Sequence, residues 1–194
     1  LDPTSPSGSR GSNPFDLVAV GDRLYVTDGG QNLVWSIDIQ TGAFSTLVAF
    51  PPIPNPLPFG PPVLDAVPTG IRYSSGQLLV TLFRGFPFPP GASVVKQVDL
   101  QTGRQADFIT GLSTAIDVLP FKGKGDTDYL VLELSHDFLA GQPGSLLGFD
   151  GPRVAHEVIT SCLVTPTALT LDEKAKTLYV TELAPGRVVA IPIW

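Results

Sequence analysis

The fold is decided by a short segment that occurs four times, as LYVTDGG at residues 24–30, LLVTLFRG at 78–85, YLVLELSH at 129–136 and LYVTELAP at 178–185. The copies begin 54, 51 and 49 residues apart. Each is rich in Leu, Val, Tyr and Thr, the composition of a β-strand. The chain is therefore built on an internal repeat of about 50 residues.

Other strand-like runs lie at fixed places around each copy. One run precedes every copy, one follows it, and a further run follows the first three. The preceding runs begin at Asn13, Val67, Leu112 and Val164, the following runs at Leu33, Val94, Ser145 and Arg187, and the last runs at Ala43, Arg104 and Val154. Helical periodicity of useful length is absent. The pattern predicts an all-β fold, a β-propeller with four blades of antiparallel meander strands, the last blade having three strands.

Turn chemistry supports this assignment. The sequences DIQTG at 38–42 and DLQTG at 99–103 are the same tight connection used twice, with glycine at the position that needs a positive φ. Between them, seven of the twelve residues from Pro51 to Pro62 are proline, which excludes a central strand. We interpret this stretch as a stiff loop joining two blades, with a polyproline ligand as the alternative.

The predicted organisation has one short terminal segment and four blades. Residues 1–11, rich in Ser, Gly and Pro, are interpreted as the remains of a flexible loop. The blades are assigned to residues 12–50, 63–111, 112–163 and 164–194.

Composition excludes several classes of function. Apolar residues make up 43% of the chain and charged residues 15%, so the chain can build a core. The net charge is −6 and no basic cluster stands out, which argues against a nucleic-acid partner. No apolar run has the length of a membrane-spanning helix. The lone Cys162 excludes an internal disulfide and is expected to be a small buried hydrophobic residue.

The repeat resembles NHL-type propeller blades, and three segments are closer to one family. SNPFDLVAV at 12–20, VPTGIRY at 67–73 and LFRGFPFPPGASVVKQVD at 82–99 resemble the ScyD/ScyE family of secreted propeller proteins, and GFPFPPGA at 85–92 is the most specific part. The resemblance runs from about Ser12 to Ile193. It implies a secreted or periplasmic protein and the carboxy-terminal blades of a ring of about six. The family's activity is not defined well enough to imply a reaction.

Aligning the repeats predicts a column of residues at the end of the second strand: Asp28, Leu82, Glu133 and Glu182. Three carboxylates in a ring could bind a hard cation such as calcium through oxygen. The alternative is that each carboxylate accepts backbone N–H groups of its own turn. We favour capping, because one copy carries leucine, and we expect no cofactor.

A second column is predicted in the innermost strand: Val18, Arg72, Asp117 and Thr170. A charge in a buried strand needs a partner, so Arg72 and Asp117 are expected to pair near the axis. Ligands of propellers usually sit at the mouth of the channel, which makes this column the better binding candidate. His136 could lie at the rim, although a solvated loop histidine is the simpler interpretation. The phenylalanines at 83, 86 and 88 form either a capping cluster or an exposed binding patch.

Two functional hypotheses follow from different classes. The first is a secreted, non-catalytic propeller that binds a small molecule, glycan or protein at one face, through Arg72, Asp117 and the rim residues. The second is a lactonase or lyase with a carboxylate or metal at the channel mouth. An open array of four blades would expose a whole sheet face at each end. We therefore expect a second chain that carries upstream blades of the same propeller and supplies the strand beside Arg187–Trp194. The alternative is a self-contained four-bladed propeller with a three-stranded last blade.

Overall fold

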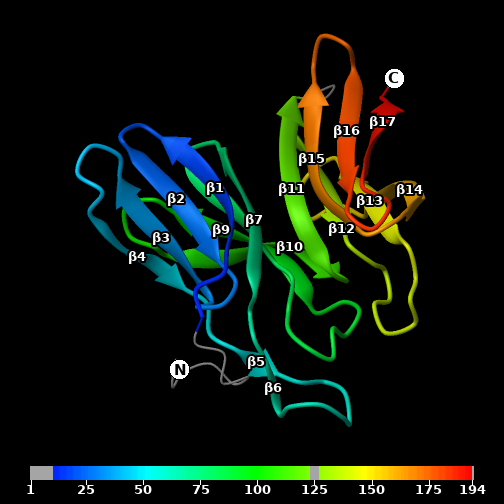
Figure 1. The fold of residues 1–194 in the computed structure, drawn as a ribbon, viewed down its shortest axis with the longest axis horizontal. Coiled ribbons are helices and arrows are strands. Elements are labelled where there is room, and N and C mark those ends of the chain that lie inside the picture. The colour runs from blue at the N-terminus through cyan, green and yellow to red at the C-terminus, as the bar shows by residue number, and fades with distance from the viewer. Residues whose placement is uncertain (1–10, 123–126, 194) are drawn as a thin grey trace.

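The structure is a computed structural model that describes residues 11–122 and 127–193 (Figure 1). Within these residues the fold is all β, as predicted, and contains no helix. The described residues therefore include no candidate for a membrane-spanning helix. The predicted loop remnant at 1–11 lies, apart from Gly11, outside the described residues.

Four sheets form the blades, each an antiparallel meander. Blade 1 contains β1 (Pro14–Val20), β2 (Arg23–Asp28), β3 (Leu33–Asp38) and β4 (Phe44–Ala49). Blade 2 contains β7 (Pro68–Ser74), β8 (Gln77–Leu82), β9 (Ser93–Asp99) and β10 (Gln105–Leu112). Blade 3 contains β11 (Ala115–Lys122), β12 (Thr127–Glu133), β13 (Gly144–Phe149) and β14 (Glu157–Leu163). Blade 4 contains β15 (Pro166–Asp172), β16 (Thr177–Glu182) and β17 (Arg187–Pro192), so its described part has the three strands expected.

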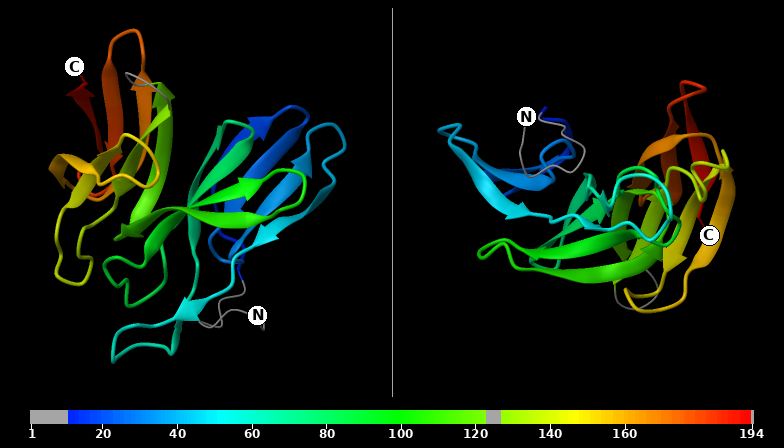
Figure 2. Two further views of the ribbon diagram at one scale, coloured as in Figure 1. Left: turned by 180° about the vertical axis from the view of Figure 1, so that it is seen from behind. Right: turned by 90° about the horizontal axis from the view of Figure 1, so that it is seen from below.

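The first strand of each blade lies on the inside of the arrangement. β1 contacts β7, β7 contacts β11, and β11 contacts β15. The blades follow one another as an open arc, with blade 1 at one end and blade 4 at the other (Figures 1 and 2). This is the propeller arrangement that the repeat predicted.

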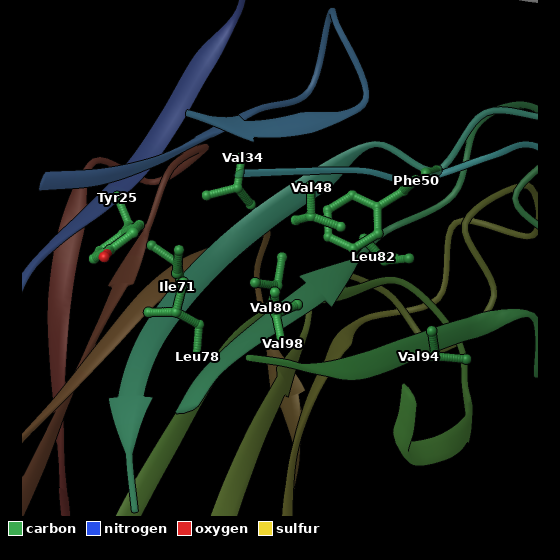
Figure 3. Packing of buried hydrophobic residues seen from close by; sticks show 11 residues of the cluster. Tyr25, Val34, Val48, Phe50, Ile71, Leu78, Val80, Leu82, Val94 and Val98 are labelled. Atoms are coloured by element: carbon green, nitrogen blue, oxygen red, sulfur yellow. The ribbon is translucent and has the colours of Figure 1, made fainter. Parts of the chain in front are cut away.

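Three apolar clusters hold neighbouring blades together. Between blades 1 and 2, Tyr25, Val34 and Val48 pack against Ile71, Leu78 and Val80 (Figure 3). The same strand positions supply Leu79, Val95, Val118 and Val131 between blades 2 and 3, and Leu130, Leu146, Leu169 and Val180 between blades 3 and 4. Each fully buried aliphatic side chain contributes about 1.5 to 3 kcal/mol. The clusters explain why apolar residues occupy both faces of the middle blades.

The duplicated turn has the same structure in both copies. One carboxylate oxygen of Asp38 accepts the backbone N–H and the hydroxyl of Thr41, both at 2.8 Å, and Asp99 does the same with Thr102 at 2.8 and 2.7 Å. Gly42 and Gly103 follow with φ of 70° and 67°, which lets the chain reverse. The hydrogen bonds from the threonines lower the pKa of both aspartates.

The proline-rich stretch contains a short ladder that the sequence did not predict. β5 (Ile53–Pro54) pairs with β6 (Val63–Leu64) outside the blades, at the bottom of Figure 1. The side chain of Asn55 donates to the carbonyls of Phe59 and Pro61, both at 2.8 Å, and so fixes the loop between the two strands. The stretch thus joins blades 1 and 2 as an ordered hairpin.

The expectation that Cys162 is buried is wrong. It lies in β14, the outermost strand of blade 3, and its side chain is exposed. Blade 4 has three strands in its described part, whereas blade 3 has four. The described part of blade 4 therefore has no fourth strand to cover β14.

The two ends of the arc expose one sheet face each. Leu17 of blade 1 is 55% exposed, whereas Ile71, Val118 and Leu169, which occupy the same position in the other blades, are 0, 0 and 3% exposed. At the far end, Tyr179 and Thr181 of blade 4 are exposed, although Tyr25 and Thr27, their counterparts in blade 1, are buried. The exposed faces carry the kinds of residue that the inner faces bury.

Candidate functional site at the inner strands

The strand register corrects one of the predicted columns. A bulge interrupts the first strand of every blade, between Pro14 and Leu17 in β1 and at the matching place in β7, β11 and β15. Beyond it, Leu17, Ile71, Val118 and Leu169 pair with the valine of each second strand, at Val26, Val80, Val131 and Val180. The inner column is therefore Val18, Arg72, Leu119 and Thr170. The placement of Asp117 in it was wrong by two residues. The hairpin that joins β11 to β12 is longer than those of blades 1 and 2, so counting back from the second strand does not align blade 3 with them.

Asp117 belongs instead to a column with Asp16, Gly70 and Ala168, so aspartate alternates with a small residue from blade to blade. Gly70 is required by this arrangement. A Cβ there would lie 2.7 Å from Asp117 Oδ1, 2.8 Å from its Cα and 2.9 Å from the carbonyl of Ile116. A side chain in blade 2 would push β11 away and displace the aspartate.

The expected ion pair at the axis is confirmed, and it has a second member. Arg72 Nη2 lies 2.7 Å from Asp117 Oδ2, and Arg72 Nη1 lies 2.6 Å from Asp16 Oδ2. Sequence reasoning missed Asp16, although the matching segments NPFD at 13–16 and TAID at 114–117 put it at the position of Asp117. One guanidinium thus bridges the inner strands of blades 1, 2 and 3.

Backbone amides complete the cluster. Asp16 Oδ2 accepts the N–H of Ile71 at 3.0 Å, and Asp117 Oδ2 accepts the N–H of Leu169 at 3.0 Å. Arg72 Nη2 also lies 3.5 Å from the carbonyl oxygen of Leu169. Each aspartate therefore bonds to the amide of the following blade, and the cluster connects all four inner strands.

The two carboxylates differ in their surroundings. The side chain of Asp117 is 1% exposed, and burial raises the pKa of this carboxyl to about 6 against the opposing effect of the Arg72 cation. The negative charge of Asp16 raises it further. The side chains of Arg72 and Asp16 are 24 and 28% exposed, so the cluster is accessible from the side that they occupy.

The carboxylates at the ends of the second strands lie apart from this cluster and accept backbone amides. Asp28 accepts the N–H of Asn13 at 2.8 Å, Glu133 accepts that of Ser113 at 2.7 Å, and Glu182 accepts that of Val164. Each bond ties the entry of the first strand to the exit of the second. Asp28 also accepts the N–H groups of Gly30 and Gln31 in its own turn, as the capping alternative describes, whereas the acceptors Glu133 and Glu182 bind residues that precede the first strand.

Blade 2 obtains the same bond in another way. Its column position is Leu82, which has no acceptor, and the N–H of Val67 instead donates to the side-chain oxygen of Asn32 at 2.8 Å. Asn32 belongs to blade 1 and donates to Asp65 Oδ1 at 3.0 Å. An asparagine from the preceding blade therefore replaces the missing carboxylate.

The three carboxylates do not form a shared charge centre. Burial raises the pKa of Glu133, whereas the amide of Val164 and the guanidinium of Arg187 lower the pKa of Glu182. Burial also opposes ionisation of Asp28, but hydrogen bonds from Ser12, Asn13 and Trp35 outweigh it and lower the pKa of Asp28. In the described part of the chain, no group of three His, Cys, Asp or Glu side chains is placed to hold a metal ion.

The remaining predicted site residues lie on loops. His136 is exposed in the loop after β12. Phe83 and Phe86 both contact Phe88, with ring centroids 5.8 and 6.0 Å apart, and Phe88 contacts Phe138 of blade 3 at 4.7 Å. Phe86 is nonetheless 49% exposed, so the aromatic loop both joins two blades and presents a surface.

Two cavities of the described residues lie away from the cluster of Arg72, Asp16 and Asp117, which we call the axial cluster. Both lie between blades 1 and 2: one of about 140 Å³ lined by Leu82 and Arg84, and a polar hollow of about 600 Å³ lined by Arg23, Ser36 and Thr102. We take the axial cluster as the candidate functional site, because its side chains converge from three blades.

Comparison with known proteins supports the fold alone. No family model matches the chain, and no curated protein matches its sequence. Among solved structures, the gluconolactonase XC5397 from Xanthomonas campestris is similar over 89% of this chain and 55% of its own, with a TM-score of 0.64 and 13% identity. A streptogramin B lyase is similar over 94% of this chain and 55% of its own, with a TM-score of 0.54 and 15% identity. The dihydro-heme d1 dehydrogenase NirN is similar over 93% and 35%, with a TM-score of 0.54 and 9% identity.

These proteins are β-propellers, and the chain spans about half the length of the first two. At such low identity they carry no residue roles to this chain. They agree with four blades that form part of a larger propeller.

Proposed function

We propose that this protein is a non-catalytic β-propeller that binds a small molecule, glycan or protein at one face of the ring, with Arg72 as the recognition group. The observation that carries the proposal is the position of Arg72, whose guanidinium is held by Asp16 and Asp117 and remains a quarter exposed. The guanidinium is already held by hydrogen bonds from both Nη atoms, so a ligand that binds beside it does not first have to order this side chain. Its natural partners are hydroxyl and carboxylate oxygens.

Binding is tested with a glycan array and with a defined set of probes, D-gluconate, D-glucuronate and D-glucose, measured by calorimetry. We expect Arg72→Met to weaken binding of the preferred probe at least about tenfold, because a charge-assisted hydrogen bond is lost. Arg104→Met, at an exposed arginine of blade 2, is the matched control and should bind normally. Unchanged binding by Arg72→Met would refute this role.

The alternative is a lactonase or lyase. One observation favours it, the pKa of Asp117 near 6, since a carboxyl that titrates near neutrality is suited to general acid or base chemistry. The gluconolactonase and the lyase among the similar structures point the same way. Against it, both oxygens of Asp117 already accept hydrogen bonds. Hydrolysis of D-glucono-δ-lactone above the uncatalysed rate, lost in Asp117→Asn, would establish the alternative.

We further propose that a second chain carrying the upstream blades completes the ring. The exposed face of blade 1 supports this, because Leu17, Leu24 and Val26 occupy the positions through which Ile71, Leu78 and Val80 pack on blade 1. At the other end, blade 4 supports it, since the described residues give this blade three strands where each of the other blades has four. Native mass spectrometry should detect a particle heavier than 20.5 kDa, and a stable monomer of that mass would contradict the proposal.

Membership of the ScyD/ScyE type of secreted propeller is also proposed. Its support is the segment Gly85–Ala92, which lies in the loop between β8 and β9 of blade 2 and contacts blade 3 through Phe88 and Phe138. Secretion predicts that the protein accumulates in the periplasm or the medium. Fractionation of the producing cells tests this, and recovery in the cytoplasmic fraction would exclude it.

A further inference from the structure

A cavity at the outer side of blades 1 and 2 is lined by a buried cation, Arg84, with one unpaired nitrogen. Arg84 follows β8 and is 5% exposed, and its Nε donates to the carbonyl of Ala92 at 3.1 Å. Its Nη1 is the one buried side-chain nitrogen or oxygen, among the residues that the structure describes, with no hydrogen-bond partner. A buried charge left incompletely paired costs several kcal/mol, so a partner for Arg84 is expected.

The cavity next to Arg84 has a mixed lining. Its volume is about 140 Å³, and Arg84, Lys96 and Gln105 supply its polar wall. Four apolar residues form the rest: Phe50, Pro51, Ile53 and Leu82. Figure 3 shows Phe50 and Leu82 side by side at one end of the cluster between blades 1 and 2. The cavity therefore has a cationic end and an apolar end.

The charge around the cavity is positive in an otherwise acidic protein. Lys96 forms an ion pair with Asp107, whose side chain is 57% exposed, and Asp107 is the carboxylate that acts on Arg84. The two cations, Arg84 and Lys96, thus interact with a single carboxylate, Asp107, that is largely exposed to solvent. Desolvation lowers the pKa of Arg84, which agrees with a guanidinium that an added anion would stabilise.

The sequence explains why the carboxylate column of the other blades supplies no acid next to Arg84. The column that supplies a carboxylate to the other blades has Leu82 in blade 2, two residues before Arg84. Leu82 is buried in the apolar cluster and brings no charge to the guanidinium. Arg84 itself has a φ of 76°, a left-handed conformation that is costly for arginine and is found at sites where function requires it.

We propose that this cavity binds a short-chain aliphatic carboxylate, whose carboxylate group contacts Arg84 and Lys96 and whose carbon chain packs against Phe50, Ile53 and Leu82. Arginine recognises carboxylates through paired N–H donors. The volume sets the size, because a cavity of about 150 Å³ holds a molecule as large as benzene. Four or five carbons fit that space. The site is independent of the axial cluster and of the function proposed for it.

The test uses sodium butyrate as the probe and butyramide, a neutral molecule of the same shape, as its control. At pH 7 and constant ionic strength, butyrate should raise the thermal midpoint in a saturable way and give a calorimetric binding curve, and butyramide should give neither. Acetate should bind more weakly because it leaves the apolar end empty. Equal effects of butyrate and butyramide, or of butyrate and sulfate, would overturn the assignment.

Variants locate the site. Arg84→Met should abolish butyrate binding, and Lys96→Met should weaken it about tenfold, in proportion to one charge-assisted hydrogen bond. Arg104→Met in the same blade should bind butyrate normally. If Arg84→Met does not fold, Lys96→Met decides alone, because this side chain is partly exposed. Normal butyrate binding by Lys96→Met would then overturn the proposal.

Discussion

The open face of blade 1 and the covered faces of blades 2, 3 and 4 are built from the same pattern. Leu17 stands where Ile71, Val118 and Leu169 stand, and yet only Leu17 is exposed. The difference does not come from the sequence of the blade, since all four are apolar at this position. It comes from position in the arc. An apolar face of this kind is normal inside a propeller and unusual on an exposed surface.

The largest expected effect tests this comparison directly. Ile71→Ala should lower the free energy of unfolding by about 4 kcal/mol, because it removes a fully buried side chain and leaves a cavity. In the chain without the proposed partner, Leu17→Ala at the equivalent position should cost less than about 1 kcal/mol, because Leu17 is exposed there. Denaturant unfolding of both variants gives the two values. A cost of several kcal/mol for Leu17→Ala would indicate that the face is already covered in solution.

The next effect concerns the column of alternating aspartate and small residues. Gly70→Ala should cost about 3 kcal/mol, since its Cβ would meet the backbone of β11 below 3.0 Å. Ala168→Val, at the same column position of blade 4, should cost little because that side chain is exposed. Thermal unfolding compares the two. Tolerance of Gly70→Ala would mean that blades 2 and 3 approach less closely than described.

Most of the fold could be predicted from the sequence, and the failures have identifiable causes. The strands follow from alternation, and the turns at Asp38 and Asp99 follow from local hydrogen bonding that any five-residue copy repeats. The register around Asp117 could not be predicted, because the hairpin between β11 and β12 is longer than those of blades 1 and 2 and the repeats do not align by counting from the second strand. Asp16 was missed for the same reason. The unpaired nitrogen of Arg84 depends on which residues of another blade fill the space beside it, and that is long-range information.

The third prediction compares Asp117 with Asp16, which occupy one column in blades 3 and 1. Burial raises the pKa of Asp117 from its ordinary value of 3.8 to about 6, so the folded state binds a proton more tightly than the unfolded state. Its contribution to stability is therefore present below about pH 4 and is lost as the pH rises to about 6, by at most about 3 kcal/mol. Asp117→Asn should remove this part of the pH dependence in denaturant titrations at pH 4, 5, 6 and 7. Asp16→Asn should reduce it but not remove it, because it takes away one negative charge that raises the pKa of Asp117. An unchanged slope in Asp117→Asn would refute the assignment.

The smallest effect concerns the duplicated turn, which has the same local structure at two different positions in the arc. The turns at Asp38 in blade 1 and Asp99 in blade 2 have the same hydrogen bonds, and both aspartates are on the surface. Their contribution is local, so it should not depend on whether the blade lies at the end or in the middle of the arc. Asp38→Ala and Asp99→Ala should each lower the free energy of unfolding slightly and by the same amount, because each removes a side-chain acceptor for two backbone N–H groups. Matched denaturant curves measure both. A cost several times larger for Asp99→Ala than for Asp38→Ala would mean that blade 1 is less stable than the middle blades for reasons within its own sheet. The exposure of Leu17 would then not be the whole difference between blade 1 and the middle blades.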